Sequence, residues 1–139
     1  MKSFTSNQLK FAGVLVILTI TFRFGLSTLL QGMEFTLAWM IAAFYGILVF
    51  VAGWYFGKKD YDSLPLYDIG FKFHLVTYII CNLIAELWFL LGFQSQYEPV
   101  ETVHLTALFW GLGLILHFIL FMRSRKNSIK GIEKTDIFD

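Results

Sequence analysis

The chain has 139 residues, of which 57% are hydrophobic and 19% aromatic, and only 15% carry a charge. A soluble domain of this length cannot bury so much apolar surface, so the composition favours a membrane protein. The formal net charge of +1 gives no support for nucleic-acid binding.

Four long apolar runs predict an all-α integral membrane protein, a bundle of four transmembrane helices in a single domain over residues 1–139. The runs cover residues 11–30, 35–56, 73–93 and 103–122, and a cytoplasmic tail follows at 123–139. Each run has about 20 residues, the length that an α-helix needs to cross a ~30 Å hydrocarbon core. The first run is too long for the apolar part of a signal peptide, so we expect a retained helix.

The distribution of lysine and arginine predicts that both ends of the chain are cytoplasmic. Ten basic residues lie in three segments on one side: Lys2, Lys10, Lys58, Lys59, Lys72, Arg123, Arg125, Lys126, Lys130 and Lys134. The short loops at 31–34 and 94–102 contain no basic residue and carry glutamates instead. By the positive-inside rule these two loops lie outside. We expect the tail to continue the fourth helix and then either to fray or to dock a partner.

Small residues recur at helix-packing intervals in two of the runs. They are Ala38, Ala42 and Gly46 in the second run, and Ala107, Gly111 and Gly113 in the fourth. Small side chains at such spacing let two helix backbones approach closely. We expect them to pack within the bundle, and a homo-oligomer interface is the alternative.

The third run carries the polar residues His74, Tyr78, Asn82 and Glu86 at intervals of four. On an α-helix this spacing places all four on one slowly slanting line, the third-helix stripe. Polar groups facing lipid are costly, so the stripe must face other helices, water or a ligand. We expect it to face the interior of the bundle, with the third and fourth helices packed as a hairpin.

Arg23 is the only basic residue inside an apolar run. It lies as far beyond Lys10 on the first helix as Glu86 lies beyond Phe73 on the third. Both charges are therefore expected roughly 20 Å from the inner boundary. Opposite charges at one depth in a bilayer should pair, so we expect an Arg23–Glu86 ion pair between these helices. Such a pair would fix the helix register or form a charged station in an ion pathway, within one subunit or between two.

His117 on the fourth helix is expected level with Tyr78, so it faces the lower half of the third-helix stripe. Three interpretations stay open: an interhelical hydrogen bond, a proton relay or pH sensor, and a metal or haem site with His74. Two histidines alone make an incomplete transition-metal site, so no cofactor is predicted.

His104 begins the fourth run on the outer side, close in sequence to Glu98 and Glu101. These three side chains either form a cation site at the outer surface or simply end a solvated loop. The second interpretation is the more common outcome for charged loop residues.

The second half of the chain resembles the bacterial 2TM domain family. The resemblance covers about residues 71–122 and rests on His74, Tyr78, Asn82, Trp110, Gly111, Gly113, Leu114 and His117. It implies a bacterial inner membrane protein with a helical-hairpin core, found alone or as the membrane part of signalling proteins. This chain departs from the family pattern by its extra N-terminal helix pair and by Glu86.

No motif for nucleophilic, phosphate-binding or zinc-protease chemistry occurs, so we do not expect an enzyme. Two functions are compatible with the sequence. The first is a homo-oligomeric channel or carrier that moves protons or small ions along the third-helix stripe and the two inner histidines. The second is a non-catalytic structural or regulatory subunit in the bilayer, whose polar residues fasten helices and whose tail docks a cytoplasmic or membrane partner.

Overall fold

The computed structural model describes residues 4–60 and 66–130, with side chains for 4–60 and 70–123. It contains four helices, α1 (Ser6–Gln31), α2 (Phe35–Asp60), α3 (Leu66–Leu90) and α4 (Val100–Lys130), and no strand within these ranges. Each helix is long and apolar enough to cross a membrane. The predicted all-α class and the four apolar helices are confirmed. The predicted docking end of the tail lies outside the described residues.

Each helix extends beyond its predicted apolar run at one end or both, although α3 ends at Leu90, before the predicted end at residue 93. At the start of α1 the reason is a helix cap, which hydropathy does not reveal. Thr5 is the N-cap of α1, and its hydroxyl accepts a hydrogen bond from the backbone N–H of Gln8. The Gln8 side-chain oxygen in turn accepts from the N–H of Thr5 at 3.0 Å. This reciprocal capping box satisfies two N–H groups at the helix start. It places the first turn of α1 well ahead of the predicted beginning at Phe11.

The turns after α1 and after α3 lie at the same end of the bundle, which we call the outer end as in the sequence-based expectation, and they share one backbone motif. After α1, the N–H of Glu34 bonds to the carbonyl of Leu29, and Met33 adopts a positive φ of 59°. After α3, the N–H of Phe93 bonds to the carbonyl of Trp88, and Gly92 has a φ of 74°. Both are Schellman turns, which need one residue in the left-handed region. Glycine meets that need at position 92, whereas methionine must meet it at position 33.

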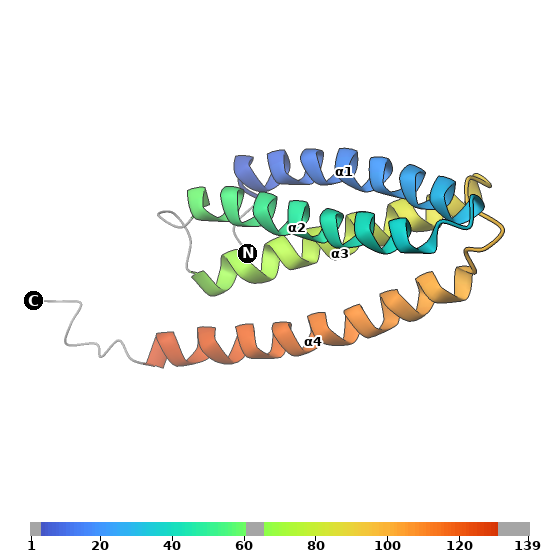
Figure 1. The fold of residues 1–139 in the computed structure, drawn as a ribbon. Helices are drawn as coiled ribbons and strands as arrows, with labels where there is room; N and C mark the ends of the chain where they lie inside the picture. Colours follow the sequence, from blue (N-terminus) through green and yellow to red (C-terminus); the bar gives the residue numbers. More distant parts are fainter. Residues whose placement is uncertain (1–3, 61–65, 131–139) are drawn as a thin grey trace, which may run out of the picture.

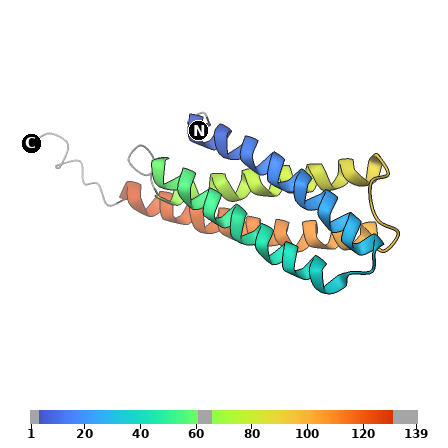
Figure 2. The same cartoon turned by 45° about the horizontal axis from the view of Figure 1, so that its top comes forward.

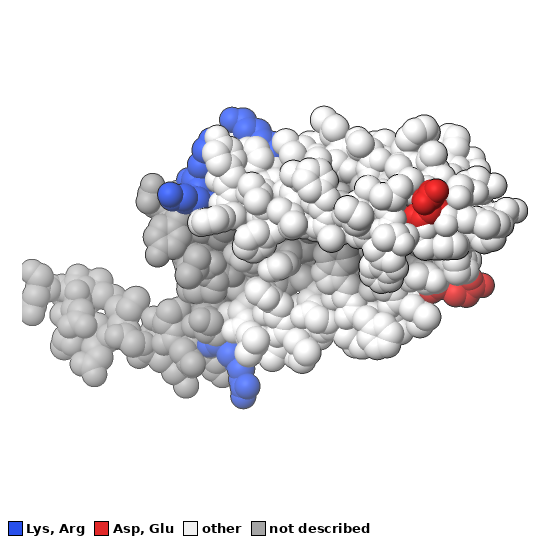
Figure 3. All heavy atoms as spheres, in the orientation of Figure 1, with Lys and Arg blue, Asp and Glu red and all other residues white. Residues whose placement is uncertain are grey.

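The helices run alternately up and down, and three of them form one body (Figure 1). Within the described residues α1 packs against α2 and α3, whereas α4 contacts only α3. Figure 2 shows α4 lying alongside α3 and crossing beneath α2. On the face drawn in Figure 3, lysine and arginine gather at one end of the molecule and the acidic residues at the other. The predicted hairpin of the third and fourth helices is confirmed.

The apolar core lies where α1 crosses α2 and α3. Its centre is Phe11 and Leu15 from α1 with Phe73 and Val76 from α3. The rings of Phe11 and Phe73 are tilted, with centroids 4.9 Å apart. These residues fill the inner half of the bundle, and the outer half of the same α1–α3 seam is polar.

Candidate functional site

A second line of polar residues follows α1, and the sequence analysis missed it. Thr19, Arg23, Ser27 and Gln31 recur at intervals of four, like the third-helix stripe. We call them the α1 stripe. The first three are buried, and all four bond to residues of α2, α3 or the loop between α3 and α4. The spacing that reveals the third-helix stripe would have revealed this one too. Charge alone indicates only Arg23 in this line, because Thr19, Ser27 and Gln31 are neutral.

Arg23 is the centre of the outer half of this network. Its Nη1 lies 2.5 Å from Oε1 of Glu98, and each side chain is only 8% exposed. Ser27 donates to the other Glu98 oxygen at 3.1 Å and accepts from Nε1 of Trp88 at 2.9 Å. The ring of Phe89 covers the guanidinium carbon at 5.5 Å. A buried carboxylate with both oxygens bonded meets the main condition for a stable ion pair in a low dielectric.

The expected pair between Arg23 and Glu86 is therefore wrong within this chain. The side of α3 that meets α1 carries Phe73 and Trp88, whereas Glu86 lies about 200° around the helix from Trp88. Matching depth alone could not show this difference in direction. The partner of Arg23 comes instead from the loop after α3, where Glu98 reaches back toward α1.

Glu86 forms a different contact, on the surface. Its Oε1 lies 3.1 Å from Nε2 of His104, and the two side chains are 52% and 59% exposed. The proposed outer cation site of Glu98, Glu101 and His104 is accordingly not assembled, because Glu98 is taken by Arg23 and His104 by Glu86. Glu101 lies exposed in the first turn of α4.

The rest of the third-helix stripe lies along the α3–α4 seam. The rings of His74 and His117 are 5.2 Å apart between centroids, so His117 faces the lower half of the stripe as expected but lies beside His74 rather than level with Tyr78. Tyr78 donates to the carbonyl of Ala107 at 3.2 Å. Asn82 donates to the backbone of its own helix, at the carbonyl of Tyr78. The stripe thus faces α4 rather than the centre of a closed bundle, and both of its ends are exposed.

The six small residues predicted to pack helices divide into two groups. Gly111 is in tight contact, since a Cβ placed there would lie 3.1 Å from the Tyr78 hydroxyl. Ala38 is buried, and Ala107 accepts the bond from Tyr78. Three residues face open space or are only half-buried: Ala42, Gly46 and Gly113. A Cβ at Gly46 would meet no atom within 4 Å, so α2 presents its small-residue line to a space instead of a helix.

That space is a long groove between the body formed by α1, α2 and α3 on one side and α4 on the other, with a volume of about 1190 Å³. Residues of all four helices line it, among them Arg23, Gly46, Trp54, Asn82, Thr106 and Trp110. Because α2 and α4 do not touch in the described residues, the groove is open between them, and the recess is visible in Figure 3. Typical ligand pockets enclose ~300–1,000 Å³, are mostly apolar and hold a few convergent polar groups.

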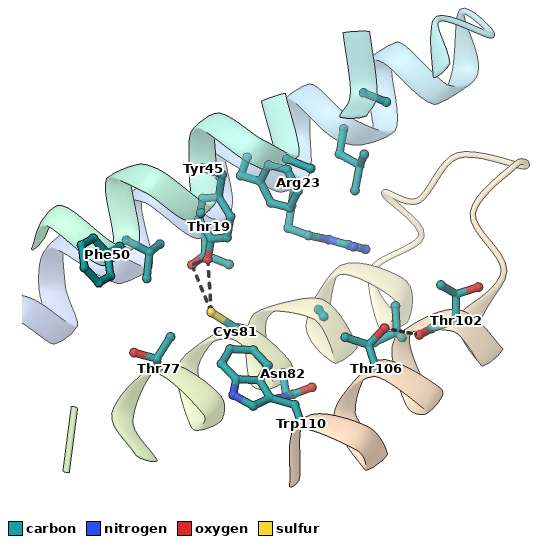
Figure 4. Close-up of a pocket in the computed structure, with 18 of the residues that line it drawn as sticks. Thr19, Arg23, Tyr45, Phe50, Thr77, Cys81, Asn82, Thr102, Thr106 and Trp110 are labelled. Atoms are coloured by element: carbon teal, nitrogen blue, oxygen red, sulfur yellow. Dashed lines mark hydrogen bonds between the residues drawn. The ribbon is translucent and has the colours of Figure 1, made fainter. Parts of the chain in front are cut away.

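Two sets of polar atoms face this groove (Figure 4). In the first, the Tyr45 hydroxyl lies 2.8 Å from that of Thr19 and 3.2 Å from the Cys81 sulfur. The second is the guanidinium of Arg23, which points into the space between the two helix pairs. Its Nε and Nη2 are buried and have no hydrogen-bond partner among the described residues. Both atoms are covered by protein atoms, so the part of the guanidinium that lines the groove is not these two donors.

A metal site is not indicated by the described residues, in which no three potential ligand side chains come together. The pair of His74 and His117 has no third potential ligand side chain beside it in this part of the chain. Comparison with protein-family models, with curated proteins and with solved structures finds no match to this chain.

Proposed function

We propose that the chain is a non-catalytic, membrane-embedded binding protein that takes up a lipophilic molecule from the bilayer into the groove between α2 and α4. The observation that carries the proposal is the open, mainly apolar groove of about 1190 Å³, which is lined by residues of all four helices. The opening between α2 and α4 would face lipid, so a ligand can enter sideways without crossing water. In this proposal the polar contacts of the third-helix stripe and of the α1 stripe hold together the helices that form the walls of the groove.

Fluorescence quenching tests the binding. Trp110 lines the groove, whereas Trp88 is buried against Ser27. Trp39 and Trp54 also line the groove but are largely exposed, so both are replaced by Phe, which keeps an aromatic ring at each position and leaves Trp110 as the reporter. The protein in lipid nanodiscs is then titrated with a brominated hexadecane. Saturable quenching of Trp110 is expected, because a bound bromine atom lies close to the indole at a limited number of sites.

A matched pair of glycine substitutions supplies the control. Gly46→Phe places a ring in the groove, and Gly13→Phe places the same ring on the outer surface of α1. A Cβ meets no atom within 4 Å at either position. Saturable quenching should be lost with Gly46→Phe and kept with Gly13→Phe. A linear dependence on bromoalkane in every variant would refute the binding function.

We further propose that the protein lies in a bacterial inner membrane with both termini in the cytoplasm. The separation of basic and acidic residues between the two ends of the molecule supports this, as does the resemblance to the 2TM domain family. In a Cys81→Ser background, Lys58→Cys should be labelled by a membrane-impermeant thiol reagent only after the cells are opened. Gln94→Cys should be labelled in intact spheroplasts. The reverse pattern would overturn the orientation.

A second candidate function is ion transport by an oligomer, and one observation favours it. Glu86 and His104 form a contact in which both side chains are more than half exposed, where a neighbouring subunit could complete a path. Proton and cation flux into liposomes should then depend on Glu86 and fall in Glu86→Gln. Equal flux in liposomes with the native chain, the variant and no protein would exclude this candidate.

A further inference from the structure

Two lysines and a tyrosine form an exposed cluster where α1 and α2 meet, at the end of the bundle opposite the outer end. The Nζ of Lys59 donates to the Tyr55 hydroxyl at 2.8 Å and lies 4.1 Å from the centre of its ring. Lys10 of α1 is close enough for its charge to act on the same hydroxyl. Tyr55 lies nine residues after Gly46, half a turn around α2 from the groove. The cluster is therefore separate from the groove.

The cluster offers hydrogen-bond donors and positive charge to an anion. Each ammonium has three N–H donors and no acceptor, and the Tyr55 hydroxyl accepts from Lys59, so its own hydrogen can be donated. Neither lysine takes part in the ion pairs of the described residues. The adjacent carboxylate, Asp60, is buried and accepts hydrogen bonds from the start of α1. Two like charges that lack a nearby countercharge attract an anion.

The depth of the cluster matches the head groups of a bilayer. The 26 residues of α1, and equally those of α2, span about 39 Å, compared with a ~30 Å hydrocarbon core. A centred helix thus extends roughly 4.5 Å beyond the core at each end. Lys59 is the penultimate residue of α2, and Lys10 lies about 6 Å from the start of α1. The Cα atoms of both lie within about 3 Å of the boundary, where lysine side chains reach the head groups.

Exposed apolar surface continues from the cluster toward the bilayer centre. Val14 follows Lys10 by one helical turn, and Val51 precedes Tyr55 by one turn, so each shares a face with its polar neighbour. The two valines are 37% and 52% exposed. A soluble anion has no use for this surface, whereas an anion that carries an acyl chain covers it.

We infer that this end of the α1–α2 seam is a binding site for an anionic phospholipid. Its phosphate accepts hydrogen bonds from Lys10, Lys59 and Tyr55, and an acyl chain lies along Val14 and Val51. The inference goes beyond the uptake of a lipophilic molecule into the groove and does not depend on it. Each lysine close to the phosphate should strengthen binding of an anionic lipid about fivefold.

A label next to the site measures lipid binding locally. In a Cys81→Ser background, Val51→Cys carries an NBD fluorophore, and the full chain is placed in phosphatidylcholine nanodiscs. A small, fixed fraction of the lipid carries a nitroxide on one acyl chain and is either phosphatidylglycerol or phosphatidylcholine. A nitroxide quenches only at short range, so the ratio of the two quenching signals reports the local enrichment of the anionic lipid. This enrichment should exceed about tenfold.

Three exposed lysines provide the variants and a matched control. Lys59→Gln and Lys10→Gln should each lower the enrichment about fivefold. Lys58 lies about 200° around α2 from Phe56, which packs against α1, so Lys58→Gln should change the enrichment less than about twofold. Equal losses in Lys58→Gln and Lys59→Gln would mean diffuse attraction to a basic surface and would overturn the site. Equal quenching by the two lipids in the chain with all three lysines would overturn it as well.

Glycerol 3-phosphate distinguishes a lipid head group from a soluble phosphate. At millimolar concentration it should leave the enrichment unchanged, because it has no acyl chain to bind the apolar surface. Unlabelled phosphatidylglycerol in excess should abolish the quenching difference. Loss of the enrichment with glycerol 3-phosphate would make a soluble phosphate compound the ligand and overturn the lipid assignment.

Discussion

Arg23 of α1 and Glu98, two residues before α4, form a buried ion pair that ties the start of α4 to the body formed by α1, α2 and α3. Each charge is shielded from solvent, so each depends on the other. Glu98→Gln alone should lower the free energy of unfolding by on the order of 3 kcal/mol, because it leaves Arg23 buried and uncompensated. Titration with SDS, followed by helical circular dichroism, measures this change.

Two further variants complete the measurement. Arg23→Met with Glu98→Gln should be less destabilised than Glu98→Gln, since no lone charge remains. Glu86→Gln should cost less than about 1 kcal/mol, because Glu86 and His104 form an exposed pair. A larger loss for Glu86→Gln than for Glu98→Gln would mean that Arg23 is paired as the sequence predicted.

Gly111 and Gly113 on α4 are predicted to differ although they are near neighbours. A Cβ at Gly111 lies 3.1 Å from the Tyr78 hydroxyl, whereas one at Gly113 meets nothing within 4 Å. Gly111→Ala should displace Tyr78 and weaken its bond to Ala107, which is worth about 1 kcal/mol. Gly113→Ala should be neutral or stabilising by up to about 1 kcal/mol, because alanine favours the helix. Equal midpoints of SDS-induced unfolding for the two variants would contradict this account of the α3–α4 seam.

The sequence allowed the four helices and the α3–α4 hairpin to be predicted, because hydropathy and short loops carry that information. It also placed His117 against the lower half of the third-helix stripe, although level with Tyr78 and about one turn from its observed neighbour His74. It did not allow the partner of Arg23 to be predicted. Depth can be counted along a helix, but the rotation of Glu86 away from α1 and the return of Glu98 depend on tertiary packing. The groove was missed for the same reason, because small residues at helix-packing spacing do not reveal whether a helix fills the space beside them.

Met33 occupies a left-handed position in the turn between α1 and α2. A side chain with a Cβ is strained there by about 1 kcal/mol, whereas glycine is not. Met33→Gly should therefore raise the free energy of unfolding by a few tenths to about 1 kcal/mol. Gly92→Ala, in the corresponding turn after α3, should lower it by a similar amount. Thermal unfolding in detergent measures both changes, and a shift of the same sign in the two variants would argue against the shared turn geometry.

Thr5, the N-cap of α1, also connects α1 to α2. The Thr5 hydroxyl caps the helix and also donates to the buried carboxylate of Asp60 at the end of α2. Thr5→Ala should cost about 1 kcal/mol for the cap, plus the loss of the bond to Asp60. Thr5→Ser keeps both interactions and serves as the control. Hydrogen exchange should accelerate at the first-turn amides of α1 in Thr5→Ala and stay unchanged in Thr5→Ser.

The single neighbour of α4 has a mechanical consequence. Within the described chain α4 touches only α3, and its outer end is anchored through Glu98 to Arg23. α4 is therefore held by one helix along its length and by one ion pair at one end. A small tilt of α4 about the end held by Glu98 would change the width of the groove at the opposite end of α4. The contacts among α1, α2 and α3 would stay unchanged. The width of the groove can thereby vary while the Arg23–Glu98 pair keeps the position of one end of α4 fixed.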